Sequence, residues 1–186
     1  LYSAAHLHIS SVFLQPGLKP GLVSLFSRAR NLGLTTSFDP QWDPAEEWDC
    51  DLENLLPQVN IFLPNIEELK NITGKNSLEE CLSGLKNRMD MIVVKKGNEG
   101  AVLWLDGKMI TQPAFLNKKV VDAIGAGDSF NAGFIHQFVN KNSVDLCLEF
   151  GALCGAVNTT ESGGTTAFRN HDTFRQIALE KFNYQL

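Results

Sequence analysis

The alternation of strand-like with helix-like segments constrains the fold of this chain more than any other feature. Short apolar runs typical of strands occur at residues 7–11, 34–38, 59–63, 91–94 and 101–105. Between them, helical spacing of apolar side chains predicts helices at residues 18–32, 67–73 and 78–88. Strands that alternate with helices in this way predict an α/β domain whose central sheet is mainly parallel.

The second half of the chain is expected to be largely helical after one hairpin. The pair Asp106 and Gly107 predicts a tight turn between two strands. Helical segments follow at residues 126–140, 144–158 and 171–182. In parallel sheets of α/β proteins, ligands bind beyond the carboxyl ends of the strands, so candidate site residues are expected there.

Composition excludes several classes of protein. Of the 186 residues, 44% are apolar and 20% are charged, as in ordinary globular domains. The net charge of −5 argues against a nucleic-acid-binding protein, which usually presents a basic surface. No apolar run approaches the roughly 20 residues that are needed to span a membrane. The predicted partners are therefore small molecules rather than nucleic acid or a membrane.

The cysteines point to a reduced compartment. They form no CxxC pair, and they lie at no zinc-ligand spacing with the four histidines. We expect free, buried thiols at all four positions: Cys50, Cys81, Cys147 and Cys154. The sequence has no recognisable signal peptide, so a cytoplasmic protein is predicted. It begins at Leu1 without a methionine and soon enters a buried strand, which suggests that a longer sequence precedes it.

The segment from Asp122 to Phe134 carries the strongest chemical signal. Gly125, Ala126 and Gly127 form a turn of small residues that leads directly into a helix, where backbone N–H groups can hold a phosphate. Asp128 follows in the first helical turn, where a general base could take a proton from an attacking hydroxyl. In isolation, the glycines could simply permit a tight turn, and Asp128 could simply cap the helix.

Two polar motifs follow predicted strands. Asn65 and Glu68 lie on one face at the start of a helix, where they could contact nucleotide phosphates and hydrated magnesium. The same spacing is that of a capping box, which is the simpler interpretation of the pair alone. Lys95 and Lys96 end a buried strand before a glycine turn. One of them could reach phosphates, although solvated lysines are the simpler interpretation.

Asn158 begins a polar, glycine-containing segment that extends to Thr166. This segment could line a nucleotide or supply carbonyl oxygens to a monovalent cation. By itself it predicts only a loop.

In this order, the four segments resemble the ribokinase-like (PfkB) family of carbohydrate kinases. The family pattern D-T-x-G-A-G-D is similar to residues 122–128, N-x-x-E to residues 65–68, and K-x-G-x-x-G to residues 95–100. Ala123 departs from the usual Thr, so a hydroxyl contact is lost there. The resemblance implies a three-layer α/β/α fold with a mainly parallel sheet. Residues 1–186 would form its C-terminal nucleotide-binding and catalytic part, without the N-terminal strands and the lid.

The resemblance also implies an activity and roles for residues. The activity is ATP-dependent phosphorylation of a hydroxymethyl group on a sugar or sugar acid, by in-line transfer. Asp128 would be the catalytic base, and the turn Gly125–Gly127, including Ala126, would be the anion hole. Nucleotide binding would involve Asn65, Glu68, Lys95, Gly97, Gly100 and Asn158.

Cofactors follow from the same resemblance. Glu68 would organise water around Mg²⁺, and Asp122 with the Ile124 carbonyl would hold a potassium-type cation. The lid that the chain lacks often builds a homodimer in this family, so the longer protein is a candidate dimer. Because most of the sugar pocket also lies in the missing portion, we expect the isolated chain to be a fragment with little or no activity.

Two alternative functions remain open from the sequence. A nucleoside kinase of adenosine type has the same fold, and the residues that read the substrate lie mainly outside this chain. A non-catalytic nucleotide-binding module is the other alternative, although the presence of Asp128 favours catalysis. A dehydrogenase is disfavoured because no G-x-G-x-x-G motif opens the first helix.

Overall fold

A computed structural model describes residues 1–86 and 88–186, and the chain divides into two compact units. Unit 1 comprises residues 1–95 and 102–109, and unit 2 comprises residues 96–101 and 110–186. Within the described ranges, no helix combines the length and the apolar character that a membrane crossing requires.

Parallel strands form the framework of unit 1. The first four strands are joined by three parallel pairings, β1–β2, β2–β3 and β3–β4: β1 (His6–Ser10), β2 (Thr35–Asp39), β3 (Ile61–Phe62) and β4 (Met91–Lys95). The sheet has six strands in the order β1-β2-β3-β4-β5-β6. The predicted mainly parallel sheet is therefore confirmed.

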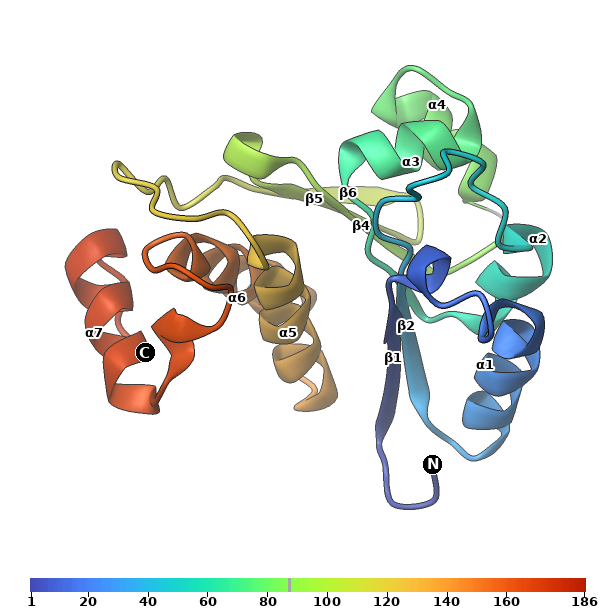
Figure 1. Cartoon of the computed structure of the whole chain (residues 1–186), viewed down its shortest axis with the longest axis horizontal. Coiled ribbons are helices and arrows are strands. Elements are labelled where there is room, and N and C mark those ends of the chain that lie inside the picture. Colours follow the sequence, from blue (N-terminus) through green and yellow to red (C-terminus); the bar gives the residue numbers. More distant parts are fainter. Residues whose placement is uncertain (87) are drawn as a thin grey trace. The chain divides into compact units, whose positions relative to one another are not determined.

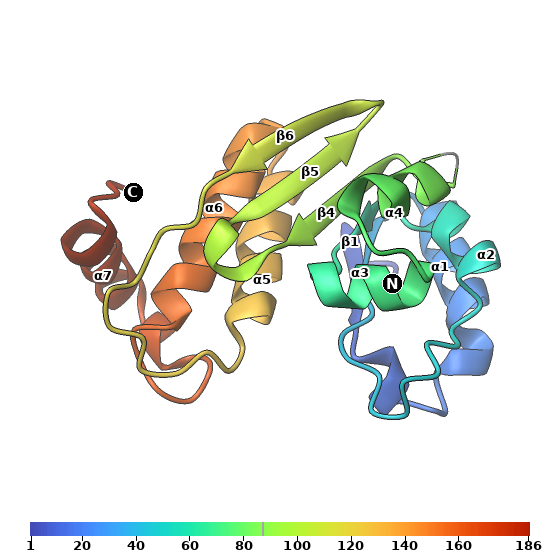
Figure 2. The same cartoon turned by 90° about the horizontal axis from the view of Figure 1, so that it is seen from above.

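The last two strands form the predicted hairpin, β5 (Ala101–Leu105) and β6 (Lys108–Gln112) (Figure 2). Asp106 and Gly107 connect them with positive φ angles of 50° and 81°. Positive φ at both central residues is what a type I′ hairpin turn requires, and Gly and Asp adopt it most readily.

Four helices cover one face of strands β1 to β4 in unit 1 (Figure 1): α1 (Leu22–Asn31), α2 (Leu52–Leu55), α3 (Ile66–Thr73) and α4 (Leu78–Leu85). Helix α1 begins later than predicted because Lys19–Gly21, which contains Pro20, forms a 3₁₀ turn before it. Strand β3 is shorter than the predicted 59–63 and comprises only Ile61 and Phe62.

Helix α4 also ends earlier than predicted. Its last residue is Leu85, whereas the apolar spacing had predicted a helix to residue 88. Residue 87 of that predicted segment lies outside the described residues.

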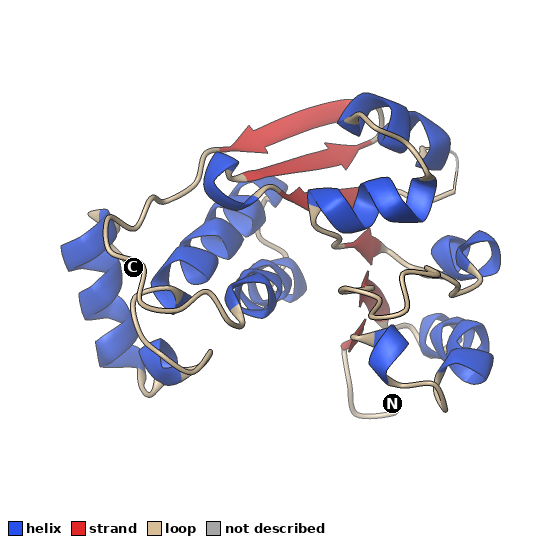
Figure 3. Ribbon diagram, turned by 45° about the horizontal axis from the view of Figure 1, so that its top comes forward, coloured by secondary structure: helices blue, strands red, loops and turns tan. Residues whose placement is uncertain are grey.

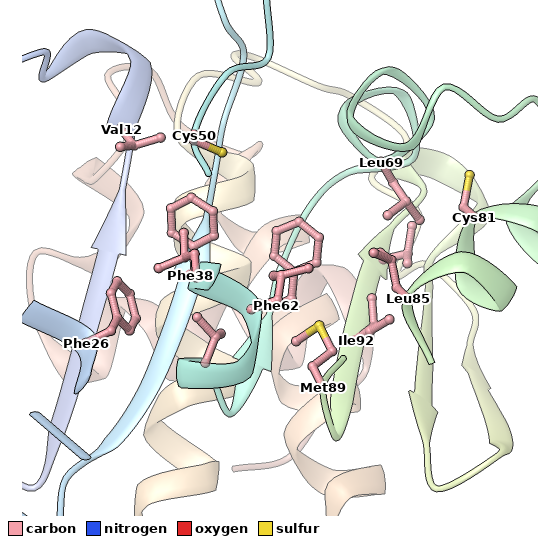
Figure 4. Close-up of a cluster of buried hydrophobic side chains, with 14 of the residues drawn as sticks. Val12, Phe26, Phe38, Cys50, Phe62, Leu69, Cys81, Leu85, Met89 and Ile92 are labelled. Atoms are coloured by element: carbon pink, nitrogen blue, oxygen red, sulfur yellow. The ribbon is translucent and has the colours of Figure 1, made fainter. Parts of the chain in front are cut away.

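Aromatic side chains form the centre of the core of unit 1 (Figure 4). The strand register places Ile9, Phe38, Phe62 and Ile92 in one row across the sheet. Phe38 stacks on Phe62 at a centroid distance of 5.9 Å, and Phe26 from α1 meets Phe38 edge-on at 6.2 Å. All of these except the partly buried Ile9 are fully buried, so the row anchors the strand ends that carry polar residues.

Unit 2 consists mainly of three helices, α5 (Ala126–Val139), α6 (Val144–Asn158) and α7 (His171–Phe182) (Figure 3). Helices α5 and α6 pack closely at Gly133, where a Cβ atom would lie 2.7 Å from the Cys154 sulfur. Leu153 and Cys154 from α6 pack with Phe174 and Ile177 from α7 in a second hydrophobic core.

The prediction of free, buried thiols is also confirmed. All four cysteines are buried and unpaired with one another. Burial raises the pKa of Cys50 and of Cys154 to about 12, and that of Cys147 to about 11. These thiols therefore remain protonated and unreactive at neutral pH. Among the described residues, no group of three or more His, Cys, Asp or Glu side chains forms a metal-binding cluster.

Candidate active site

The turn before α5 is the centre of the candidate site in unit 2. Gly125 stands at the N-cap with φ of 75°, and its carbonyl accepts a hydrogen bond from the Ser129 N–H at 2.8 Å. A Cβ atom on Gly125 would lie 3.2 Å from the Cα and carbonyl oxygen of Gly164. Glycine is therefore required both by the left-handed backbone and by the close approach of the neighbouring loop.

The N–H groups of this turn are not all available to a ligand. Ala126 donates to the Ala123 carbonyl at 3.2 Å, so its N–H already has an acceptor inside the turn. The N–H groups in the first turn of any α-helix have no acceptor within that helix, and they lie at the positive end of its dipole. In α5 this first turn includes Gly127 and Asp128. The geometry thus suits an anion at the start of α5.

Asp128 is exposed in the first turn of α5 and lines a cavity of about 810 Å³ that belongs to unit 2. Gly125, Gly164, Phe150 and Phe168 are among the other residues that line this cavity. A carboxylate that lines such a cavity can accept a proton from a bound hydroxyl group. The cavity therefore offers room for a ligand beside the predicted base.

Asp122 fastens the turn to the loop that follows α6. One carboxylate oxygen accepts the Ile124 N–H at 2.9 Å, and the other accepts the Gly163 N–H at 3.0 Å. These two backbone donors, Gly163 first, lower the pKa of Asp122. Asp122 therefore has a structural role, because it links the turn before α5 to the loop after α6.

Asn158 fastens the same two segments from the inside. It is the last residue of α6 and only 2% exposed. Its side-chain nitrogen donates to the Gly164 carbonyl at 2.9 Å and to the Ile124 carbonyl and the Ser129 hydroxyl at 3.2 Å each. Its side-chain oxygen is buried and, among the described residues, has no hydrogen-bond partner. Asn158, which is expected to bind the nucleotide, therefore forms a buried bridge between the turn before α5 and the loop after α6.

Asp122 and the Ile124 carbonyl are the groups expected to hold a potassium ion. They do not fit a cation that would join the turn before α5 to the loop after α6. Both carboxylate oxygens of Asp122 accept backbone N–H groups. The Ile124 carbonyl accepts the amide of Asn158, whose nitrogen lies within 3.2 Å of both loop carbonyls. A cation shared by the carbonyls of Ile124 and Gly164 would therefore compete with hydrogens that carry partial positive charge.

Asn65 and Glu68 form a complete capping box at the start of α3 in unit 1. The Asn65 side chain accepts the Glu68 N–H at 2.8 Å, and the Glu68 carboxylate accepts the Asn65 N–H at 2.8 Å. Glu68 is only 4% exposed. The simpler interpretation of this spacing is thus confirmed, and it fixes a carboxylate at the carboxyl edge of the sheet.

Lys95 forms a buried ion pair with Asp39 at the same edge. Its ammonium lies 2.5 Å from the Asp39 carboxylate, and the two side chains are only 12% and 1% exposed. The backbone of Lys95 bridges to Asn65 beside it, and its N–H donates to the Pro64 carbonyl at 3.0 Å. The interpretation of Lys95 as a solvated lysine is therefore wrong.

Gly97 and Gly100 shape a turn in unit 2. Gly97 has φ of 57° and opens a 3₁₀ turn, while Gly100 has φ of 93°. A Cβ atom on Gly100 would lie 2.0 Å from the carbonyl oxygen of Gln112. Close packing against the backbone of Gln112 therefore explains why position 100 requires glycine. A role in nucleotide binding stays a prediction for both Gly97 and Gly100.

The predicted site residues fall into two groups, one in each unit. Unit 2 brings the turn of small residues together with three others: Asp122, Ile124 and Asn158. Unit 1 brings together the capping box and the ion pair: Asn65, Glu68, Asp39 and Lys95. The sequence pattern did not indicate the contacts of Asp39 with Lys95 and of Ser129 with Asn158. Only the position of Asp39 after a predicted strand could have indicated one of them.

Comparison with known proteins identifies relatives along most of the chain. The model described as pfkB family carbohydrate kinase matches residues 1–170. An uncharacterized sugar kinase of Archaeoglobus fulgidus is 32% identical over 143 residues, which cover 74% of this chain and 56% of that protein. A 2-dehydro-3-deoxygluconokinase of Haemophilus influenzae is 34% identical over 138 residues, covering 70% and 43%. The chain spans about half the length of these curated relatives.

Solved structures agree with this assignment. A nucleoside kinase of Methanocaldococcus jannaschii, an archaeal member of the ribokinase family, matches with a TM-score of 0.73 and 25% identity over 88% of this chain and 52% of that one. A fructokinase double mutant of Vibrio cholerae, solved with fructose, ADP and potassium ion, matches with a TM-score of 0.78 and 25% identity, over 95% and 59%. The predicted ribokinase-like α/β fold is confirmed, and the chain belongs to the pfkB family of carbohydrate kinases.

Proposed function

We propose that this chain supplies the nucleotide-binding and catalytic part of a kinase that transfers the γ-phosphoryl group of ATP to a hydroxyl of a sugar or sugar acid. The observation that carries the proposal is the turn before α5. Gly125 creates the turn, α5 begins at Ala126, and Asp128 lines the adjoining cavity. Sugar-acid and sugar kinases among the relatives support this substrate class.

Asp128 acts as the general base in the proposed reaction. Its carboxylate accepts the proton of the acceptor hydroxyl as the oxygen of that hydroxyl bonds to the γ-phosphorus. The bond from this phosphorus to the bridging oxygen breaks, and ADP leaves with the electron pair. A base in the first helical turn is near any anion held there, so proton acceptance and phosphoryl transfer occur at one end of α5.

The start of α5 stabilises the charge of the transferring group. The first-turn N–H groups and the positive end of the helix dipole favour an anion, and they need no reorganisation during the reaction. The small residues Gly125, Ala126 and Gly127 allow the phosphoryl group to approach the backbone. These residues therefore form the anion hole in the proposal.

Unit 1 contributes the residues proposed for ATP and magnesium. Glu68 fits the group that Mg²⁺ requires, because its buried carboxylate is held in place by the capping box and oxygen is the preferred ligand type. Asn65 and Lys95 are proposed to bind the ATP phosphates. When bound, Mg²⁺ neutralises charge on those phosphates. Gly97 and Gly100 are proposed to lie near the nucleotide.

The remaining expectations belong to the same proposal. They are a cytoplasmic location, a homodimer of the longer protein, and little or no turnover by the chain alone. The last expectation rests on the observation that the relatives extend over about twice the length that the chain covers.

A nucleoside kinase is the second candidate function. The solved nucleoside kinase of Methanocaldococcus jannaschii is as similar in sequence to this chain as the fructokinase is, at 25% identity. The apolar wall of the unit 2 cavity, which includes Phe150 and Phe168, is also compatible with an aromatic base.

One experiment tests the proposal and separates its alternatives. The full-length protein is incubated with MgATP and, in parallel, with fructose, 2-dehydro-3-deoxygluconate, ribose or adenosine, and products are followed by ³¹P NMR. ATP binding is measured in the same samples by calorimetry. Phosphorylation of a sugar or sugar acid supports the leading function, and phosphorylation of adenosine alone supports the second. Failure to bind ATP under any condition contradicts both, whereas ATP binding without turnover by the full-length protein indicates a non-catalytic module.

A further inference from the structure

Two carbonyl oxygens approach each other where the turn before α5 meets the loop after α6. The oxygens of Ile124 and Gly164 both lie within 3.2 Å of a single atom, the side-chain nitrogen of Asn158. Carbonyl oxygens carry partial negative charge, so two of them that face one point repel each other unless a positive group lies between them. The amide hydrogens of Asn158 supply that partial positive charge.

The orientation of this amide follows from its neighbours. If the amide were turned over, its oxygen would face the two carbonyl oxygens, and no donor would lie between them. In the present orientation the side-chain oxygen is left buried without a hydrogen-bond partner among the described residues. An unpaired buried acceptor costs roughly 1–3 kcal/mol. We infer that the hydrogen bonds donated by the Asn158 nitrogen stabilise this site by more than the unpaired oxygen destabilises it.

The bridge lies next to the proposed anion hole. Ile124 precedes Gly125, and Ser129, the third acceptor around the amide, follows Asp128 in α5. Asp122 clamps the same turn to Gly163 from the exposed side. The two side chains together determine how the turn and the loop are held relative to each other. Asn158 contacts no atom that would react, so its role is one of positioning.

We propose that the side-chain amide of Asn158 takes the place of a monovalent cation at this junction and holds the anion-binding turn in its active geometry without potassium. The proposal rests on the proposed function only for its relevance to catalysis, because the junction itself is a property of the fold. It differs from the expectation that Asp122 and the Ile124 carbonyl hold a potassium ion.

The test measures thermal unfolding in potassium chloride and in choline chloride at equal ionic strength. The wild-type protein is expected to have the same Tm in both salts, to within about 1 °C. In Asn158→Ala the two carbonyls lose their bridge, so the Tm in choline should fall by about 4 °C or more. Potassium should restore at least half of that loss, because the opened position can now accept a cation.

Asn117→Ala is the matched control. Asn117 donates to the Thr159 carbonyl at 3.2 Å, so this variant also removes an asparagine hydrogen bond within unit 2 but leaves the junction intact. Its Tm should fall without any recovery in potassium. Asn158→Asp provides a second variant, which places oxygens at the junction and should gain more from potassium than Asn158→Ala does.

Two results overturn the proposal. One is a wild-type Tm that rises by several degrees in potassium, which shows that the native junction binds the cation. The other is an Asn158→Ala or Asn158→Asp protein that folds and has the same Tm in both salts. If neither variant folds, the wild-type comparison decides alone. None of these measurements depends on turnover, so failure of the kinase assay leaves the test intact.

Discussion

Gly125 is the residue on which the geometry of the turn before α5 depends most directly. Its φ of 75° is in the left-handed region, and the backbone of Gly164 lies where its Cβ atom would be. Both conditions exclude larger residues for physical reasons that do not involve a ligand. Gly125 also lines the cavity of unit 2, beside the first turn of α5.

Gly125→Ala is expected to lower the free energy of unfolding by about 1–3 kcal/mol because it combines a strained φ with a close contact. Urea denaturation monitored by circular dichroism measures the change. Gly84→Ala is the matched control: Gly84 lies inside α4 with open space around it, so alanine should raise stability by about 0.5–1 kcal/mol. Equal effects of the two substitutions would contradict this account of the turn.

His6 is a second residue whose environment determines a measurable property. Its ring bonds the Ser37 hydroxyl at 2.7 Å, as does the ring of His8. Burial, and then the neighbouring His8, lower the pKa of His6 from 6.5 to about 4. In the unfolded chain His6 binds a proton at a higher pH than in the folded chain. The stability associated with neutral His6 is therefore complete above pH 6.5 and is lost as the pH falls.

The free energy of unfolding of the wild-type protein is expected to decrease between pH 6.5 and about pH 5, above the range in which ordinary carboxylates titrate. His6→Gln keeps a polar side chain but cannot take up the proton, so its stability should change less over the same interval. Denaturant titrations at several pH values give the two slopes. Identical slopes would show that His6 is not the group responsible.

The sequence allowed some of these residue roles to be predicted. Small residues directly before a helix indicated an anion-binding turn, and the spacing of Asn65 and Glu68 indicated a capping box. The contacts of Asn158 with Ile124 and of Lys95 with Asp39 join residues 34 and 56 positions apart. Such contacts depend on the tertiary fold, and no local pattern in the sequence predicts them.

At the level of elements, helix α3 illustrates how local chemistry fixes a boundary. Both hydrogen bonds of its capping box are present, and Gly74 ends it with φ of 64°. Helix α4 has only the first half of such a box, since Ser77 accepts the Glu80 N–H at 3.3 Å. The start of α3 should therefore be more stable than that of α4.

Asn65→Ala removes the acceptor of the α3 cap and is expected to cost about 1–2 kcal/mol of stability. Ser77→Ala removes the weaker cap of α4 and is expected to cost less, about 0.5 kcal/mol. Chemical denaturation of the two variants under the same conditions provides the comparison. A larger loss in Ser77→Ala than in Asn65→Ala would contradict the assignment of the capping box.

Helices were predicted most accurately where apolar periodicity and caps agreed. Helices α6 and α7 begin and end at the predicted residues, with Ser143 and Asn170 as caps. An error occurred where a short 3₁₀ turn came first, before α1. A 3₁₀ turn has much the same residue preferences as the start of a helix, so composition does not separate the two.

At the scale of the whole molecule, the two compact units carry different parts of the proposed chemistry. Unit 2 contains the turn before α5 with Asp128, and unit 1 contains Glu68 and Lys95. In the proposed reaction Asp128 is the base of the phosphoryl transfer, and this claim concerns chemistry rather than folding.

The most direct test of this claim is the rate of phosphoryl transfer from MgATP by the full-length protein, compared with Asp128→Asn and with the control Asp145→Asn. Asp145 is an exposed carboxylate in the first turn of α6, so its loss should leave the rate unchanged. Asp128→Asn should lower kcat by about 10²–10⁴-fold with little change in ATP affinity. A kcat for Asp128→Asn within a fewfold of the wild-type value would contradict the account.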